Sequence, residues 1–134
     1  MHRIGLAAAA ALVIALTLAA ARPAAQQQLM FDIEGIWHYG PAGTTTCVRE
    51  GLSVTCTLVT PSTTHLFIGR YISPTQIAFH ITRRNRMSGC TTFMSATVTM
   101  LSYIVYSANW TALDSNCDLR AGQTGVDAAW NRVN

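Results

Sequence analysis

Residues that could carry out catalysis are sparse in this chain of 134 amino acids. The three histidines that follow the N-terminal segment, His38, His65 and His80, have no cysteine or carboxylate at metal-ligand spacing beside them. No G-x-S-x-G motif marks an activated serine. Because the chain contains no lysine, a Schiff-base or P-loop lysine mechanism is excluded.

The acidic residues also give no catalytic pattern. Those that follow residue 25 are Asp32, Glu34, Glu50, Asp114, Asp118 and Asp127. A carboxylate pair that hydrolyses a glycosidic bond must converge across about 5–9.5 Å, and the sequence shows no such pair. We therefore predict no catalytic residue, no metal site and no cofactor, and the sequence favours a protein that is not an enzyme.

Arginines form the one charge cluster, at Arg83, Arg84 and Arg86 around Asn85. The cluster lies where a predicted strand enters a loop. Arginines in that position could form a rim that contacts an anion, such as a lipid head group, a phosphate or an acidic protein. The alternative is a solvated turn whose charges oppose edge-to-edge strand pairing.

Aromatic residues are concentrated in the central predicted strands, at Phe79, Phe93, Tyr103, Tyr106 and Trp110. If the fold is hollow, one face of this set would line a cavity and bind an apolar ligand. If side chains fill the interior, as in many short eight-stranded barrels, the same residues form a packed core. The sequence leaves both possibilities open.

Residues 1–25 have the layout of a secretory signal peptide. Arg3 precedes an uncharged apolar run over residues 4–21, and Arg22 and Pro23 end the run. Cleavage fits after Ala21 or after residue 25, and the second cut leaves residues 26–134 as a single domain. The alternative is an uncleaved anchor, because a run of this length just spans a bilayer; after cleavage no stable membrane span remains.

Loss of the N-terminal segment also changes the charge balance. The whole chain has a formal net charge of +3. Without Arg3 and Arg22, seven arginines stand against six acids, which leaves a net charge of +1. This low charge argues against a nucleic-acid partner.

The four cysteines predict two disulfides, because an even number in a small exported domain is typical of a disulfide framework. A two-residue turn at Gly51-Leu52, with glycine first, places Cys47 opposite Cys56. That position is a non-hydrogen-bonded pair with Cα atoms about 4.5 Å apart, which suits a disulfide. We predict Cys47–Cys56 and Cys90–Cys117. The rival, a zinc site, lacks C-x-x-C or H-x-x-x-H spacing.

Alternation of apolar and polar residues predicts strands throughout residues 26–134. Ile77, Phe79 and Ile81, for example, share one face of a predicted strand, and His80 lies on the other. The predicted strands lie near 34–39, 44–50, 53–60, 64–72, 76–84, 91–99, 102–111 and 126–133, with a bend near residues 100–102. Their even spacing favours an all-β, antiparallel, eight-stranded up-and-down barrel, which leaves no open edge. A two-sheet β-sandwich is the alternative.

The two ends of the predicted barrel carry a family resemblance. The first strand contains Gly35-Ile36-Trp37, a G-x-W motif, and the last strand contains Arg132. These features resemble the calycin group of small secreted barrels, which includes lipocalins and avidin-like proteins. In that group the tryptophan closes one barrel end and the basic residue packs over its ring, a cation–π contact. The resemblance implies structural roles for Gly35, Trp37 and Arg132, although a T-D-Y-like second lipocalin motif has no counterpart here.

The sequence therefore predicts an exported, periplasmic or secreted β-barrel that binds a small apolar molecule. The alternative is an envelope protein-interaction module, such as a hydrolase inhibitor, that presents residues 83–90 or 61–64 as a rigid loop. The identity of the ligand or partner and the oligomeric state stay open.

Overall fold

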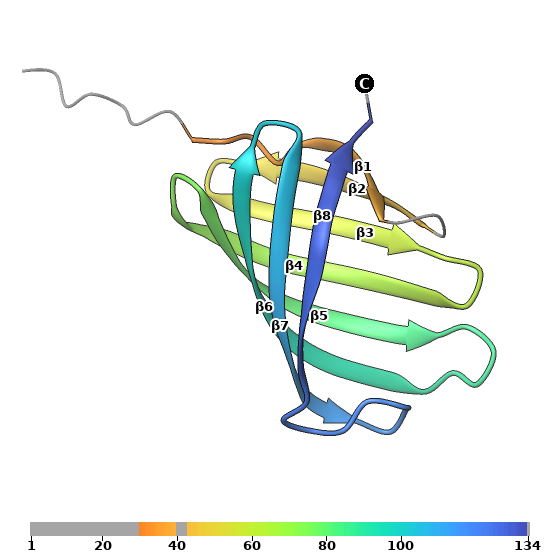
Figure 1. Cartoon of the computed structure of the whole chain (residues 1–134). Coiled ribbons are helices and arrows are strands. Elements are labelled where there is room, and N and C mark those ends of the chain that lie inside the picture. Colours follow the sequence, from red (N-terminus) through yellow and green to blue (C-terminus); the bar gives the residue numbers. More distant parts are fainter. Residues whose placement is uncertain (1–29, 40–42, 134) are drawn as a thin grey trace, which may run out of the picture.

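The computed structural model describes residues 30–39 and 43–133 (Figure 1). The predicted signal peptide, residues 1–25, lies outside these residues. Within the described part, no helix is long and apolar enough to cross a membrane.

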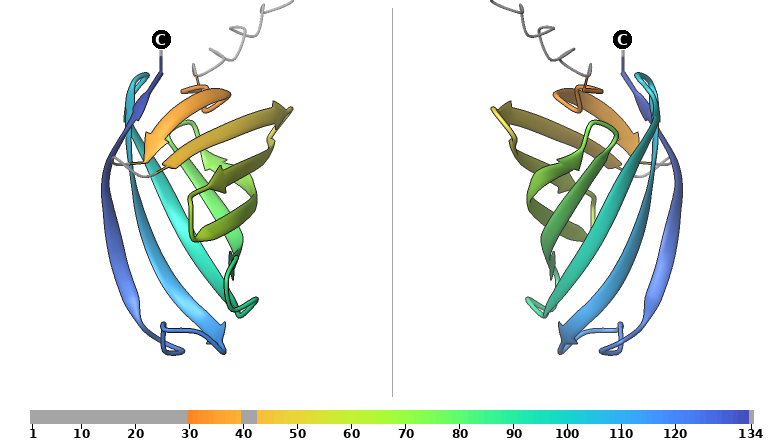
Figure 2. Two further views of the ribbon diagram at one scale, coloured as in Figure 1. Left: turned by 90° about the vertical axis from the view of Figure 1, so that its right-hand side faces the viewer. Right: turned by 90° about the vertical axis from the view of Figure 1, so that its left-hand side faces the viewer.

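Eight antiparallel strands close into a barrel in which each strand pairs with its sequence neighbours. The strands are β1 (Gly35–Tyr39), β2 (Gly43–Glu50), β3 (Ser53–Val59), β4 (Thr63–Ser73), β5 (Gln76–Asn85), β6 (Thr91–Ser102), β7 (Val105–Ser115) and β8 (Thr124–Arg132). β8 completes the ring by pairing with β1, Arg132 opposite Trp37 and Asn131 opposite His38. Figure 2 shows the tilted strands curving around one interior. The predicted barrel is confirmed and the sandwich is excluded.

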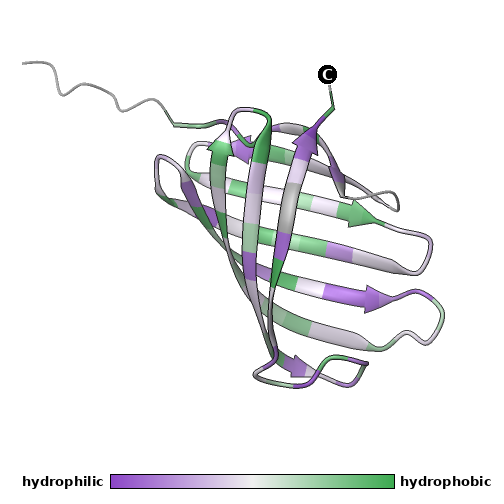
Figure 3. Cartoon of the chain, viewed as in Figure 1, coloured by the Kyte–Doolittle hydropathy of each residue, from purple (hydrophilic) through white to green (hydrophobic). Residues whose placement is uncertain are grey.

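Alternating burial follows from the strand period of two. In β3, Val54, Cys56 and Leu58 are buried, whereas the residues between them are exposed. Figure 3 shows the matching bands of apolar and polar residues along the strands. The inward-facing residues form one hydrophobic cluster inside the ring.

The β2–β3 hairpin has the register that the glycine turn predicts. Gly51 has a φ of +61°, Glu50 opposes Ser53, and Cys47 opposes Cys56. The Cys47–Cys56 disulfide is buried, with its Cα atoms 4.0 Å apart.

The second disulfide, Cys90–Cys117, joins the residue before β6 to the loop after β7. Both predicted pairings are confirmed. Two disulfides are consistent with an oxidising periplasmic or extracellular environment.

The turn between β6 and β7 lies later than the predicted bend at residues 100–102. β6 continues to Ser102, and Tyr103 and Ile104 make the turn. No glycine, proline or asparagine marks this turn in the sequence. It is formed instead by a register shift between Met100 and Ser102, and the Ser102 hydroxyl accepts a hydrogen bond from the Ile104 N–H at 3.3 Å.

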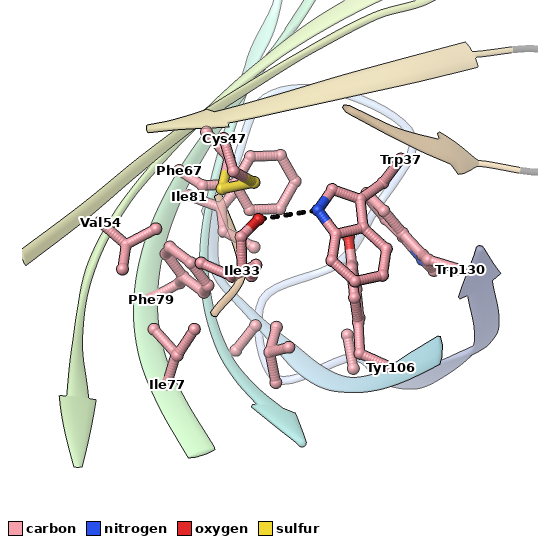
Figure 4. Close-up of a cluster of buried hydrophobic side chains, with 14 of the residues drawn as sticks. Ile33, Trp37, Cys47, Val54, Phe67, Ile77, Phe79, Ile81, Tyr106 and Trp130 are labelled. Atoms are coloured by element: carbon pink, nitrogen blue, oxygen red, sulfur yellow. Dashed lines mark hydrogen bonds between the residues drawn. A yellow bond between two sulfur atoms is a disulfide. The ribbon is translucent and has the colours of Figure 1, made fainter. Parts of the chain in front are cut away.

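One end of the barrel, here called the closed end, is filled by the segment before β1. Trp37 is fully buried, and its indole Nε1 donates to the Ile33 carbonyl at 2.8 Å (Figure 4). The Tyr71 hydroxyl donates to the Phe31 carbonyl at 2.6 Å and accepts from the Ile33 N–H at 3.0 Å. These bonds hold residues 31–33 across the barrel end.

Arg132 fastens the closed end from β8. Its guanidinium carbon lies 4.6 Å from the centroid of the Trp37 ring. Its nitrogens donate to the carbonyls of Glu34 (2.8 Å), Tyr103 (2.9 Å) and Asp32. Gly35 has a φ of +132°, and a Cβ on it would lie 3.3 Å from Arg132 Nη1. This arrangement of Gly35, Trp37 and Arg132 is compatible with a calycin-like fold.

We expect Arg132→Met to lower the free energy of unfolding by about 2 kcal/mol, because it removes the cation–π contact and three charge-assisted hydrogen bonds from a partly solvated site. Arg70→Met, at an exposed position of β4, is the matched control and should change it by less than about 0.5 kcal/mol. Urea unfolding followed by tryptophan fluorescence measures both. Equal effects of the two substitutions would contradict the role given to Arg132.

Candidate functional site

The barrel contains a cavity of about 520 Å³, within the range of roughly 300–1,000 Å³ typical of ligand sites. Its lining includes Thr60, Pro61 and Ser62 from the loop after β3 and Leu119 from the loop after β7. These loops lie at the end opposite the closed end, here called the loop end. The cavity therefore extends from the middle of the barrel to the loop end.

Small inward-facing residues account for the empty volume. Ala96 on β6 and Ala108 on β7 line the cavity, where a packed barrel would carry larger side chains. Trp110 lies opposite Gly125, and a Cβ on Gly125 would come within 2.3 Å of the Trp110 ring. The indole thus rests on the bare backbone of β8, which leaves the barrel centre open.

Aromatic rings make up much of the cavity wall. Phe79, Tyr106 and Trp110, three of the aromatic residues that the sequence analysis singles out, line it, and Phe67 and Trp130 line it as well. The ring centroids of Phe67 and Phe79 lie 5.8 Å apart, those of Phe67 and Trp130 6.2 Å, and those of Tyr106 and Trp130 4.9 Å. Figure 4 shows Phe67, Phe79, Tyr106 and Trp130 pointing into the same interior.

Phe93 and Tyr103 do not line the cavity, which corrects their sequence-based placement. Even-numbered residues of β6 face inward over residues 92–100, so Phe93 faces outward and is 49% exposed. Tyr103 lies in the β6–β7 turn and is 69% exposed. Sequence reasoning missed Phe67 because its neighbours Leu66 and Ile68 are also apolar, which hides the period of two.

The arginine cluster is divided between the two sides of β5. Arg83 faces inward and lines the cavity, whereas Arg84 is exposed on the outer side. Arg86 is exposed in the next loop, where its Nη1 donates to the Thr60 carbonyl at 3.3 Å. Because alternate residues of a strand face opposite sides, the three arginines do not form one rim. Arg83 alone faces the interior.

Three polar side chains lie at one level of the cavity wall, that of Arg83. The register places Thr45, Leu58, His65 and Arg83 side by side on strands β2 to β5. Thr45 Oγ1 is buried and has no hydrogen-bond partner among the described residues. His65 Nε2 shares a 3.0 Å hydrogen bond with the Thr63 hydroxyl. Burial, and secondarily the charge of Arg83, lower the pKa of His65 to about 4, so the imidazole is neutral at pH 7.

At the loop end of the cavity, Arg83 forms an ion pair with Asp118. Arg83 Nη1 and Nη2 donate to the Asp118 carboxylate at 2.8 and 3.5 Å. The hydrogen bond from Arg83 lowers the pKa of Asp118 below its usual value. The loop that carries Asp118 is fastened by the Cys90–Cys117 disulfide, and its Leu119 packs on the core.

In residues 30–39 and 43–133, no three histidine, cysteine, aspartate or glutamate side chains lie together so that they could hold a metal ion. The site offers a bound molecule apolar surface, a buried hydroxyl at Thr45, a neutral imidazole at His65 and the guanidinium of Arg83. These groups suit binding of a largely apolar molecule with a polar end.

Comparison with known proteins gave no match to a family model, to a curated protein or to a solved structure. The evidence for function is therefore the geometry of the barrel and its cavity.

We expect the fold to lose stability as the pH falls from about 6.5 to about 4. The folded-state pKa of His65, about 4, lies below the ordinary 6.5. The unfolded chain therefore binds this proton first, so the stability contributed by neutral His65 is complete above pH 6.5 and is lost progressively below it. His65→Gln should remove the loss of stability that protonation of His65 causes at low pH. His80→Gln, on the outer side of β5, should leave that loss unchanged.

The melting temperatures of the wild type and of the two variants, recorded at a series of pH values, measure this pH dependence. An NMR titration of the His65 ring with a midpoint near 6.5 would contradict the burial described here.

Proposed function

We propose that this protein is a non-enzymatic carrier that holds a small apolar molecule inside its barrel. The observation that carries the proposal is the cavity of about 520 Å³, whose wall is mainly aromatic and aliphatic. Trp37 and Arg132 seal one end of the barrel, so a ligand would enter from the loop end.

The rigidity of the wall supports binding. Removing apolar surface from water is favourable by roughly 25 cal/mol per Å², and a preformed wall needs little ordering when a ligand enters. The closed ring of strands and the two disulfides supply that preformed wall.

We place the protein in the periplasm or outside the cell. The two disulfides suit such a compartment, and the pattern of residues 1–25 is that of an export signal. The contacts among Gly35, Trp37 and Arg132 support a calycin-like, that is lipocalin-like or avidin-like, identity. Barrels of this size in that group hold one small ligand.

A second candidate function rests on the loop between β5 and β6. Met87 in this loop is 88% exposed, and Asn85 Oδ1 accepts hydrogen bonds from the N–H groups of Met87 (2.9 Å) and Ser88 (3.0 Å). The Arg86 N–H donates to the Ser62 carbonyl at 2.8 Å, which ties the loop to its neighbour. A rigid, exposed loop suits an envelope protein-interaction module, such as a hydrolase inhibitor.

Ala96→Phe is expected to abolish binding of N-phenylnaphthylamine, a neutral apolar probe that fluoresces in apolar surroundings, because the new ring would occupy the cavity. The substitution should change the free energy of unfolding by less than about 1 kcal/mol, whereas overpacking a filled core would cost about 1–3 kcal/mol. Probe titration and urea unfolding measure the two effects.

Ala78→Phe is the matched control. Ala78 is the exposed β5 residue next to Phe79, the cross-strand partner of Ala96, and it borders a second hollow along β5 to β8, whose lining also includes Ala96. Binding that survives Ala96→Phe but is lost with Ala78→Phe would place the probe outside the barrel and contradict the proposal. No fluorescence gain with the wild type would favour the loop module instead.

A further inference from the structure

The charged lining of the cavity points to a particular end on the ligand. Arg83 lies on β5 two residues nearer the loop end than Ile81, which lines the apolar part of the cavity together with Phe79 and Met94. The guanidinium is therefore at the outer level of the cavity, and the apolar wall extends inward from it. A molecule that enters tail first would bring its other end to Arg83.

Another anion could replace Asp118 as the ion-pair partner of Arg83. The side chain of Arg83 is only 20% exposed, whereas that of Asp118 is 68% exposed. Arg83 belongs to a strand and Asp118 to a loop, so the arginine is the fixed member of the pair. Ion pairs with so exposed a member contribute little to stability, and another anion at the same place would replace the carboxylate of Asp118 at small cost.

The surroundings of Arg83 offer polar contacts to a ligand. His65, directly opposite Arg83 on β4, is neutral at pH 7. Asp127 places one acidic side chain in the cavity lining, and this residue takes part in an interaction within the protein. The buried Thr45 hydroxyl, without a partner among the described residues, is available to a polar atom of a ligand.

The exposed charges at the loop end also favour an anionic ligand. Around it, the described residues include three exposed arginines, Arg84, Arg86 and Arg120, against the exposed acids Asp114 and Asp118. This excess of positive charge attracts an anion over a distance of about a Debye length.

We propose that the ligand is a single-chain amphiphile whose anionic head group binds Arg83 in place of Asp118 and whose apolar chain occupies the cavity. This inference rests on the proposed carrier function and adds the chemical class of the ligand. A guanidinium recognises a carboxylate or a phosphate through paired hydrogen bonds, so the shared requirement is an anionic head.

Displacement of N-phenylnaphthylamine by dodecanoate and by dodecanol tests the head group, because the two compounds share a chain and differ in charge. Arg83→Met should weaken dodecanoate at least about tenfold and change dodecanol less than about twofold. Arg84→Met, the outward-facing neighbour, should change neither. Asp118→Asn removes the competing carboxylate and should tighten dodecanoate by about two- to fivefold without changing dodecanol.

Two failures can be told apart in this experiment. If dodecanoate does not displace bound probe, or if Arg83→Met weakens dodecanoate and dodecanol equally, the head-group assignment is wrong while the carrier function stands. If the probe itself does not bind to the wild type, the carrier function fails. The dodecanol measurement also reports whether each variant retains a folded cavity.

Discussion

Closure of the sheet between β1 and β8 is the constraint on which the rest of this structure depends, because an open eight-stranded sheet would expose two unpaired edges. β1 is short, and its pairing with β8 places Arg132 opposite Trp37. Arg132 then covers the buried indole and donates hydrogen bonds to the carbonyls of Asp32 and Glu34. One arginine therefore joins the last strand to the first and holds the segment before β1 across the closed end.

With one end sealed, the sizes of the inward-facing side chains decide what the barrel contains. Trp37 fills the closed end, whereas Ala96 and Ala108 leave the middle empty. The bare backbone of Gly125 accommodates the Trp110 ring against β8. The outcome is an asymmetric interior, which is apolar in its depth and carries Arg83 at its outer level. We propose that such an interior selects a molecule with two unlike ends.

Local patterns in the sequence predicted the features that depend on near neighbours. Alternation placed the buried face of β3 and β5, and a glycine turn predicted the register of Cys47 with Cys56. Features that depend on distant residues were not predictable in this way. The β6–β7 turn at Tyr103 carries no turn residue. The empty volume depends on which small residues meet across the ring, and the partner of Arg83 lies in a separate loop.

Binding inside the barrel is tested most sharply by locating a bound apolar molecule relative to the inner and outer faces of the barrel wall. Intermolecular nuclear Overhauser effects between N-phenylnaphthylamine and the methyl groups of the protein report that position. We expect contacts with the inward-facing methyls of Ile81, Met94 and Ala96 and none with the exposed Leu66 and Ile68. Contacts with Leu66 and Ile68, and none with Met94 and Ala96, would show that the molecule binds outside the barrel and would contradict the proposed carrier function.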